Sequence, residues 1–309
     1  MLATEQLRRQ ISAASELLQV VRTLRAIAVV TLREFELAEA AVTRYAEAVG
    51  QGLALTLAPP ETPAEQPSPY ARIPEDAPTV TRSATPAPLG LVAIGSDHGI
   101  CGRFNESLVD ALRPRLTAEQ PARIIVLGAR LAARLASEGV TPEAEFPMPK
   151  TADAVSSTSG EVLIRIEQWQ DEGVDEVVLA HNTRTEIATH EAVELQLLPL
   201  DTKALIAEHP WPGDSKPMIL GEREPVGREL LDQYLRTIVA QALTRSSVAE
   251  NEARLLATQG AQRNIEQRID DLHAEYRHAY QGAETEELLD VGSGFEAITH
   301  SESGGPGGG

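Results

Sequence analysis

The chain has 309 residues, 42% of them hydrophobic and 24% charged, so a sizeable core is possible and wholesale disorder is not expected. Its formal net charge of −19 disfavours direct nucleic-acid binding, because no overall cationic field is available to displace phosphate counterions. The single cysteine, Cys101, excludes an internal disulfide framework and a cysteine-based zinc site. No apolar run is long enough to span a bilayer, and the N-terminus lacks the features of a signal peptide. We therefore expect a soluble chain made in a reducing compartment.

Residues 1–56 are predicted to form one long helix of a coiled coil. The first 50 residues contain no proline, and their only glycine is Gly50. Apolar residues follow the four-three rhythm of a heptad seam at Leu7, Ile11, Ala14, Leu18, Val21, Ala28, Leu32, Phe35, Val42, Ala46 and Val49. A second apolar stripe is formed by Leu17, Val20, Leu24 and Ile27. Pairing of two helices along the first seam would leave this stripe exposed to solvent, so we expect something else to cover it.

A proline-rich stretch, residues 57–87, is predicted to be an extended linker, because proline removes the amide donor and blocks helix formation. Residues 88–226 then alternate short apolar runs with helix-like segments, which indicates an α/β (Rossmann-like) domain with a parallel sheet. The predicted strands are Leu89–Ile94, Arg123–Leu127, Val174–Ala180 and Glu194–Leu200, and the predicted helices are Glu106–Leu116, Ala129–Ser137 and Glu161–Glu172.

Residues 227–300 return to the helical rhythm without a proline and are predicted to form the second long helix of the coiled coil. The seam there runs through Leu231, Leu235, Ile238 and Ala242, then through Ile265, Ile269, Leu272, Tyr276, Ala279 and Ala283. Its phase slips near Ser246 and Ser247, which indicates a local change in how the helix packs. Residues 301–309 are glycine-rich and are expected to be disordered. Two heptad seams at opposite chain ends are buried most simply by packing on each other as an antiparallel coiled coil.

The densest motif is the run from Ser96 to Asn105, which follows a predicted strand and precedes a predicted helix. One interpretation is an active site with a Cys101 nucleophile beside His98, or a phosphate-binding loop. The other is a tight strand-to-helix turn that needs glycine for its backbone angles. The turn is favoured, because neighbours in sequence rarely face each other correctly and the loop matches neither the dinucleotide nor the Walker pattern.

The remaining chemistry-bearing residues do not assemble a catalytic site. His181 and His190 are expected at the surface or in turns, and seven histidines in the whole chain offer no evident ligand cluster. His273 and His278 are five apart, which is not the spacing of a helical zinc pair. We therefore predict no catalytic residue, no metal and no cofactor.

The motifs together resemble those of a family, the γ subunits of F-type ATP synthases, and the chain is similar to a divergent member of it. The run from Ser96 to Asn105 resembles the family's S-D-x-G-L-C-G-x-x-N signature. The run from Glu250 to Ala257, followed by Ala261 and Asn264, resembles S-E-x-x-A-R-M-x-A-M and its continuation. A third resemblance, to R-Q-x-x-I-T-x-E-L-x-E-I-x-x-G, involves Gln281, Thr285, Glu287, Leu288, Asp290, Ser293 and Gly294. The resemblance covers both helices and the inserted domain.

The resemblance implies a central-stalk rotor that transmits torque between the membrane c-ring and the catalytic α/β hexamer and catalyses nothing itself. It implies as partners the α and β subunits, the ε subunit and the c-ring, with peripheral association on the cytoplasmic face of a bacterial plasma membrane and no nucleic acid. By similarity, the subunit-contact and coupling residues are Leu24, Arg254, Asn264, Gln281, Thr285, Glu287 and Asp290. The residues of the motif turn are Ser96, Asp97, Gly99, Cys101, Gly102 and Asn105.

Two other functions stay open on the residues alone. The chain would be a hydrolase or ligand-binding module if Asp97, His98 and Cys101 formed a site in an α/β domain flanked by coiled-coil arms. It would be a coiled-coil scaffold without a rotary role if only the terminal seams mattered. The seams do not separate a rotor from a scaffold, whereas the matched motifs do.

Overall fold

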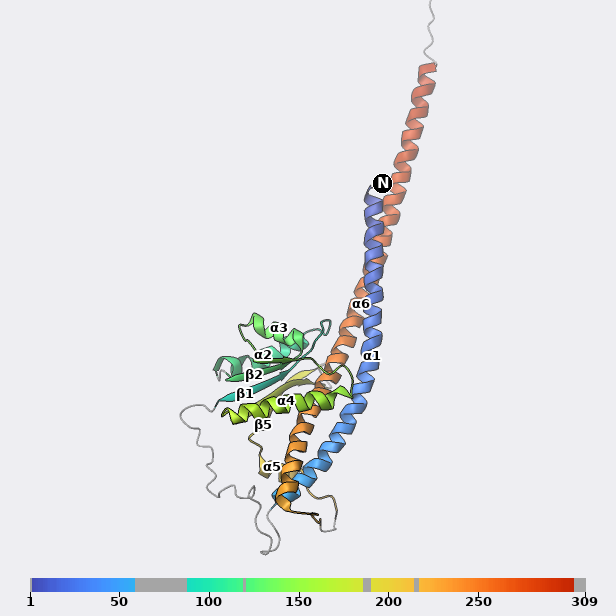
Figure 1. Cartoon of the computed structure of the whole chain (residues 1–309). Coiled ribbons are helices and arrows are strands. Elements are labelled where there is room, and N and C mark those ends of the chain that lie inside the picture. Colours follow the sequence, from blue (N-terminus) through green and yellow to red (C-terminus); the bar gives the residue numbers. More distant parts are fainter. Residues whose placement is uncertain (1, 59–87, 119–120, 186–189, 214–216, 303–309) are drawn as a thin grey trace, which may run out of the picture. The chain divides into compact units, whose positions relative to one another are not determined.

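The computed structural model of the chain describes residues 2–58, 88–118, 121–185, 190–213 and 217–302 (Figure 1). Two terminal helices, α1 (Leu2–Leu57) and α6 (Arg223–Glu302), enclose the other elements in sequence. These are β1 (Leu89–Ile94), α2 (Phe104–Ala118), β2 (Arg123–Leu127), α3 (Ala129–Ser137), β3 (Ala144–Phe146), α4 (Ala154–Asp171), β4 (Glu176–Thr183), β5 (Glu191–Leu198) and α5 (Thr202–Glu208). Residues 59–87 of the predicted linker and 303–309 of the predicted tail lie outside the described part.

The chain forms two compact units, each described by itself. The first combines the residues up to Ala26 with those from Thr258 onward, so it contains the start of α1 and the later part of α6. The second contains Ile27–Ala257, with the sheet, the short helices and the remaining parts of α1 and α6.

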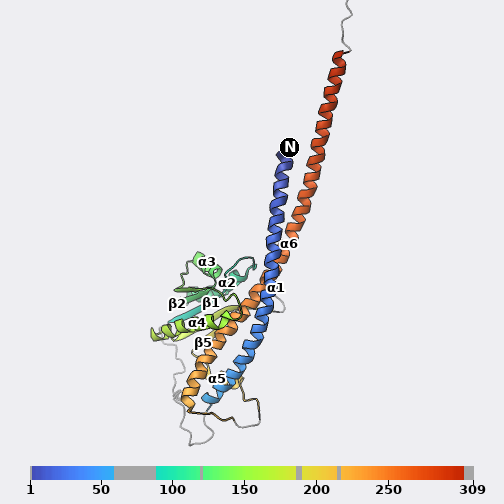
Figure 2. The ribbon, with the colours of Figure 1, turned by 45° about the vertical axis from the view of Figure 1, so that its right-hand side comes forward.

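In the first unit, α1 and α6 lie side by side and run antiparallel (Figures 1 and 2). Arg25 donates a hydrogen bond to Gln262 at 3.1 Å, and Arg22 forms an ion pair with Glu266 at 2.9 Å. Further along, the Arg8 guanidinium lies 5.5 Å from the ring centroid of Tyr276. As the residue number falls in α1 the partner's number rises in α6, which is the register of an antiparallel pair.

The predicted seam of α1 is on the covered side of this pair. Leu18 and Val21 are buried and Ile11 is half-buried, while Leu272 of α6 is only 2% exposed. In the second stripe, Leu17 and Val20 are exposed to 53% and 54%, while Leu24 is half-buried. Burial therefore separates the two apolar faces of α1 as their spacing predicts.

In the second unit, the five strands form one sheet in the order β3-β2-β1-β4-β5. Strand β1 pairs parallel with β2 and with β4, and β2 pairs parallel with β3. Strand β5 is antiparallel to β4, so the sheet is mixed at one edge, whereas the sequence predicted a parallel sheet. The reason is the short connection between Thr183 and Glu191, because a parallel return would need a crossover of a dozen or more residues.

Helices cover both faces of the sheet (Figure 1). Leu89, Leu91 and Ala93 point to one face, where they form a core with residues of α2 and α3. Val92 and Ile94 alternate to the other face, where the core includes α4, α6 and Phe35 of α1. Because both faces of β1 are covered, all six of its residues are buried, which explains the continuous apolar run in the sequence.

Helix α6 is enclosed where it crosses this second core. Val239, Leu243 and Val248 belong to the core beneath the sheet, and Ser246 and Ser247 between them are buried as well. Ser246 Oγ lies within 3.5 Å of the carbonyl oxygen of Ile94, which satisfies a hydroxyl inside the protein. The predicted slip in the seam therefore falls where α6 has neighbours beyond α1.

Polar contacts join α1 to the rest of the second unit. The Glu34 carboxylate accepts a 2.7 Å hydrogen bond from the amide of Ala152, directly before α4. At the end of α1, Arg223 donates to the carbonyl oxygens of Leu55 and Ala58, orphan acceptors of a helix C-terminus. These bonds join α1 to the segment before α4 and to the start of α6.

Two local predictions were wrong. Helix α4 begins at Ala154 instead of Glu161, because Gly160 does not break it: a Cβ there would lie 2.5 Å from Arg236 Nη1, so the glycine makes room for that side chain. His181 was expected at the surface or in a turn, but β4 extends to Thr183 and buries it. Burial lowers the pKa of His181, which keeps the ring neutral, and its Nδ1 lies 3.0 Å from the Asn182 carbonyl oxygen.

Replacing Leu272 with Asp should place an unpaired charge in the covered face of the first unit. We expect the free energy of unfolding to fall by about 3 kcal/mol, with a smaller loss for Ile269→Asp at a half-buried position. The matched control is Leu289→Asp, since Leu289 is 68% exposed on the same helix and should change stability by about 0.5 kcal/mol or less. Thermal melting followed by circular dichroism measures all three. Equal melting of Leu272→Asp and wild type would show that Leu272 is not in the seam.

Replacing Gly90 with Ala should destabilise the second unit, because a Cβ there would lie 2.7 Å from the buried ring of Trp169. We expect a loss of about 1–3 kcal/mol from overpacking. Gly260→Ala is the control: no atom lies within 4 Å of its Cβ position on α6, so it should stabilise by up to about 1 kcal/mol. Chemical denaturation gives both values, and an unchanged Gly90→Ala would argue against the close Trp169 contact.

Candidate functional site

The motif between β1 and α2 is a closed network of hydrogen bonds. The Ser96 amide donates to Asn105 Oδ1 at 3.0 Å, and Asn105 Nδ2 donates back to Ser96 Oγ at 2.8 Å. Ser96 Oγ in turn donates to the His98 carbonyl oxygen at 3.1 Å. The two side chains thus join the end of β1 to the first turn of α2.

Asp97 joins the motif to the rest of the sheet's carboxyl edge. Its two carboxylate oxygens accept 3.0 Å hydrogen bonds from the amides of Ala129, at the start of α3, and Met148, after β3. A carboxylate is well suited to the first of these, because the N-terminus of a helix carries unpaired amide donors and a partial positive charge. Asp97 therefore holds three loops in place and is engaged on both oxygens.

Backbone geometry explains one of the two glycines of the turn. Gly102 has a φ of 62°, in the left-handed region that favours glycine, and Ile100 also has a positive φ of 61°. Gly99 instead lies beside the Arg130 side chain, 3.4 Å from a Cβ placed there. The turn interpretation of this motif thus has a backbone reason at Gly102, whereas the contact at Gly99 would not exclude a side chain.

Cys101 lacks the surroundings of a nucleophile. It is buried in a small cluster with Phe104, Ala249 and Ala253. Its thiol lies 3.7 Å from Ser96 Oγ and donates to the His98 carbonyl oxygen at 3.6 Å. Burial raises the pKa of the Cys101 thiol, whereas reactive cysteines have theirs lowered. The geometry therefore favours a structural Cys101 over a hydrolytic one.

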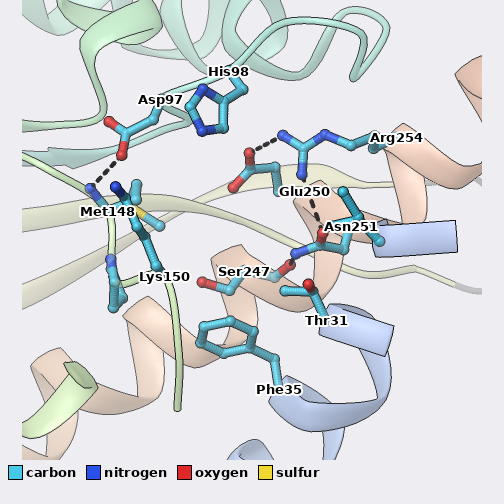
Figure 3. Close-up of a pocket in the computed structure, with 12 residues that line it drawn as sticks. Thr31, Phe35, Asp97, His98, Met148, Lys150, Ser247, Glu250, Asn251 and Arg254 are labelled. Carbon is cyan, nitrogen blue, oxygen red and sulfur yellow. Dashed lines mark hydrogen bonds and ion pairs between the residues drawn. The ribbon is translucent and has the colours of Figure 1, made fainter. Parts of the chain in front are cut away.

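A cavity of about 190 Å³ lies next to this turn, within the second unit (Figure 3). The turn contributes Asp97 and His98, the segment after β3 contributes Met148, Pro149 and Lys150, α1 contributes Ile27, Thr31 and Phe35, and α6 contributes Ser247, Glu250, Asn251 and Arg254. The cavity brings together a predicted coupling residue, Arg254, and a predicted turn residue, Asp97. Among the described residues, no group of three or more histidine, cysteine, aspartate or glutamate side chains could hold a metal ion.

Glu250 and Arg254 form an ion pair one helical turn apart, and both side chains are largely buried. The other guanidinium nitrogen donates to Asn251 Oδ1 at 3.1 Å, and Asn251 Nδ2 donates to the Ser247 carbonyl oxygen at 2.8 Å. Burial raises the pKa of Glu250 to about 7, and the Asp97 charge acts in the same direction, while Arg254 opposes both. The carboxyl group therefore changes charge near neutral pH.

The other predicted coupling residues belong to the first unit. Leu24 is half-buried on α1, and Asn264 and Gln281 are exposed on α6. Thr285 Oγ1 donates to the Gln281 carbonyl oxygen at 2.8 Å, one helical turn earlier. Glu287 and Asp290 lie on α6, but their side chains are outside the described part of the structure. Their roles by similarity stay predictions.

The sequence analysis placed His98 in a possible site with Asp97 and Cys101, but it did not bring Glu250 or Lys150 to the same place. The spacing of Glu250 and Arg254 was an available signal, because an acid four residues before an arginine on a helix favours an ion pair. The meeting of α6 with Asp97 and Lys150 had no signal in the sequence, since it depends on the packing of three separate elements.

Comparison with known proteins bears on the whole chain. The family model described as ATP synthase matches residues 3–298. The ATP synthase gamma chain of Alkaliphilus metalliredigens is 27% identical over 209 residues, which cover 67% of this chain and 72% of that one. The gamma chain of Aliarcobacter butzleri is 28% identical over 222 residues, covering 69% and 73%.

Solved structures share the fold. A chain of the Euglena gracilis mitochondrial ATP synthase, solved as OSCP/F1/c-ring, aligns with a TM-score of 0.68 at 18% identity, covering 99% of this chain and 98% of that one. A chain of the Tetrahymena thermophila central stalk and c-ring aligns with a TM-score of 0.52 at 17% identity, covering 78% and 99%. Because the family model covers nearly all of the 309 residues, the chain belongs to the ATP synthase γ-chain family.

Proposed function

We propose that this chain is the central-stalk rotor of an F-type ATP synthase and transmits torque between the membrane c-ring and the catalytic α/β hexamer. The observation that carries the proposal is the family match over both terminal helices and the inserted domain. As a γ chain, the protein is not the catalytic subunit of that complex.

The helices are suited to a shaft. At about 1.5 Å per residue, the 56 residues of α1 extend about 84 Å and the 80 residues of α6 about 120 Å. When the two helices pair, each covers the apolar seam that the other would expose to solvent if it stood alone. The interhelical contacts, from Arg25 with Gln262 to Arg8 with Tyr276, extend along the first unit and oppose sliding of one helix along the other.

The exposed residues of the second apolar stripe support a contact between α1 and subunits that surround it. Leu17 and Val20 present apolar surface on the side of α1 that α6 does not cover. Exposed apolar patches mark interaction surfaces, and a rotating helix needs contacts that exclude water without fixing one orientation. We assign this stripe to the α and β subunits of the hexamer.

We further assign the ε subunit and the c-ring as partners of the inserted domain, and peripheral membrane association through the complex, on the cytoplasmic face of a bacterial plasma membrane. Within the described part of the chain, no helix is long and apolar enough to cross a membrane. Attachment through other subunits is consistent with that finding.

Co-expression with the α and β chains of the same genome tests the assignment. We expect one copy of this chain to co-purify with each hexamer, and we expect ATP hydrolysis by the complex and none by this chain alone. A chain that never joins the hexamer would refute the rotor function. Hydrolysis by the isolated chain, lost in Cys101→Ser, would support the hydrolase alternative instead.

The stripe can be tested in the same system with Val20→Glu, which places a charge on the surface assigned to the hexamer. Because burying an unpaired carboxylate costs a few kcal/mol, recovery of the variant in the complex should fall tenfold or more. Gln19→Glu is the control at an exposed neighbouring position and should assemble as wild type does. Circular dichroism should show equal helix content in all three chains. Normal assembly of Val20→Glu would remove the stripe from the proposed contact.

A further inference from the structure

The position of Arg254 raises a mechanical question about the coupling role assigned to it by similarity. Its side chain is only 13% exposed, because it folds back along α6 onto Glu250 and Asn251 (Figure 3). The ion pair with Glu250 and the hydrogen bond to Asn251 hold the guanidinium against its own helix. It must leave Glu250 before it can reach far beyond its own helix.

We infer that Glu250 is a positioning residue that holds Arg254 withdrawn beside the cavity while its carboxylate is charged, and that protonation of Glu250 weakens this hold so that the guanidinium extends more readily. The cavity of about 190 Å³ next to the pair provides room for the side chain to move. The contact that holds Arg254 beside Glu250 lies within this chain and needs no other subunit. Its consequence, a contact of extended Arg254 with the surrounding subunits, rests on the proposed rotor function.

The groups around Glu250 explain why its charge can change. On α6, Arg254 favours the carboxylate. From the turn after β1, Asp97 opposes it, His98 lines the same cavity, and the thiol of Cys101, whose pKa burial raises, also senses the Glu250 charge. Lys150 lines it from the segment after β3, and α1 contributes only Ile27, Thr31 and Phe35, none of which titrates. Burial outweighs Arg254, and the pKa of Glu250 rises to about 7.

The sign of the effect follows from that direction. Above about pH 7 the carboxylate is charged and the ion pair holds Arg254, whereas below it Glu250 is neutral and the attraction weakens. Because the folded-state pKa is raised, Glu250 contributes stability that is fully present below its unfolded pKa of about 4.3 and lost as pH rises through about 7. The charged carboxylate therefore holds Arg254 at pH values above about 7, where the contribution of Glu250 to stability has already been lost.

Arginine labelling of the full chain with phenylglyoxal, measured by mass spectrometry, tests the inference. The readout is the labelling of Arg254 divided by that of exposed Arg130 in the same sample, which cancels the reagent's own pH dependence. Between pH 8 and pH 6 the neutral fraction of a group titrating at about 7 rises about tenfold. We therefore expect the wild-type ratio to rise about tenfold.

Glu250→Gln should label strongly at both pH values, because the amide carries no charge to hold the guanidinium. Glu252→Gln is the matched control on the same helix, where the carboxylate faces Arg184 instead, and it should follow wild type. His98→Gln should keep the pH dependence, which assigns the titration to Glu250 instead of the nearby imidazole.

A wild-type ratio that is flat with pH, or equal ratios in wild type and Glu250→Gln, would overturn the inference. Should Glu250→Gln fail to fold, the wild-type and His98→Gln series still decide it. A second readout is the melting temperature between pH 4.5 and 7.5, whose decline with pH should be smaller in Glu250→Gln than in wild type. None of these measurements needs the hexamer, so a failure here is distinct from a failure of the rotor assignment.

Discussion

The fold depends on one burial constraint: long helices at the two chain ends have apolar seams that neither helix can cover alone. Helix α6 solves this in two ways along its length. In the first unit its partner is α1, with an ion pair, a hydrogen bond and a cation–π contact beside a narrow buried face. In the second unit it also packs under the sheet, where Val239, Leu243 and Val248 share a core with β1 and β4. The small buried residues there, such as Ala242 and Ser246, allow close approach from several sides.

The motif after β1 has a structural role of its own. A run of serine, aspartate, glycine, cysteine and asparagine resembles catalytic machinery when it is seen only as sequence. In the structure Asn105 is engaged with Ser96, and Asp97 with two backbone amides. Side chains whose polar atoms are already hydrogen-bonded are poorly placed to react with a substrate, but they stabilise the loops that they connect. Hydrogen bonds therefore connect the loops at the edge of the sheet next to α6, where that helix is buried on several sides.

Much of this architecture could be predicted from the sequence, for identifiable reasons. Strands β1 and β2 were predicted at their observed bounds because strands covered on both faces appear as uninterrupted apolar runs. The heptad spacing placed Leu18 and Val21 on the buried face and Leu17 and Val20 on the exposed one. The start of α4 was missed because glycine usually interrupts helices, and at Gly160 the decisive neighbour, Arg236, is distant in sequence. The cavity was missed for the same reason: its walls come from four separate segments.

The ion pair of Glu250 and Arg254 is the feature that packing alone explains least. Taking two charges out of water costs several kcal/mol per ion, and well-packed apolar side chains of similar volume often stabilise a core as well or better. The surroundings increase that cost, because Asp97 is a second carboxylate whose charge opposes ionisation of Glu250. A core selected only for stability would have little need of this pair beside a cavity. The balance between desolvation and the arginine leaves Glu250 near the midpoint of its titration at neutral pH, where small changes in its surroundings alter its charge most. The position of Arg254 on the shaft helix is therefore coupled to the local electrostatics of the inserted domain.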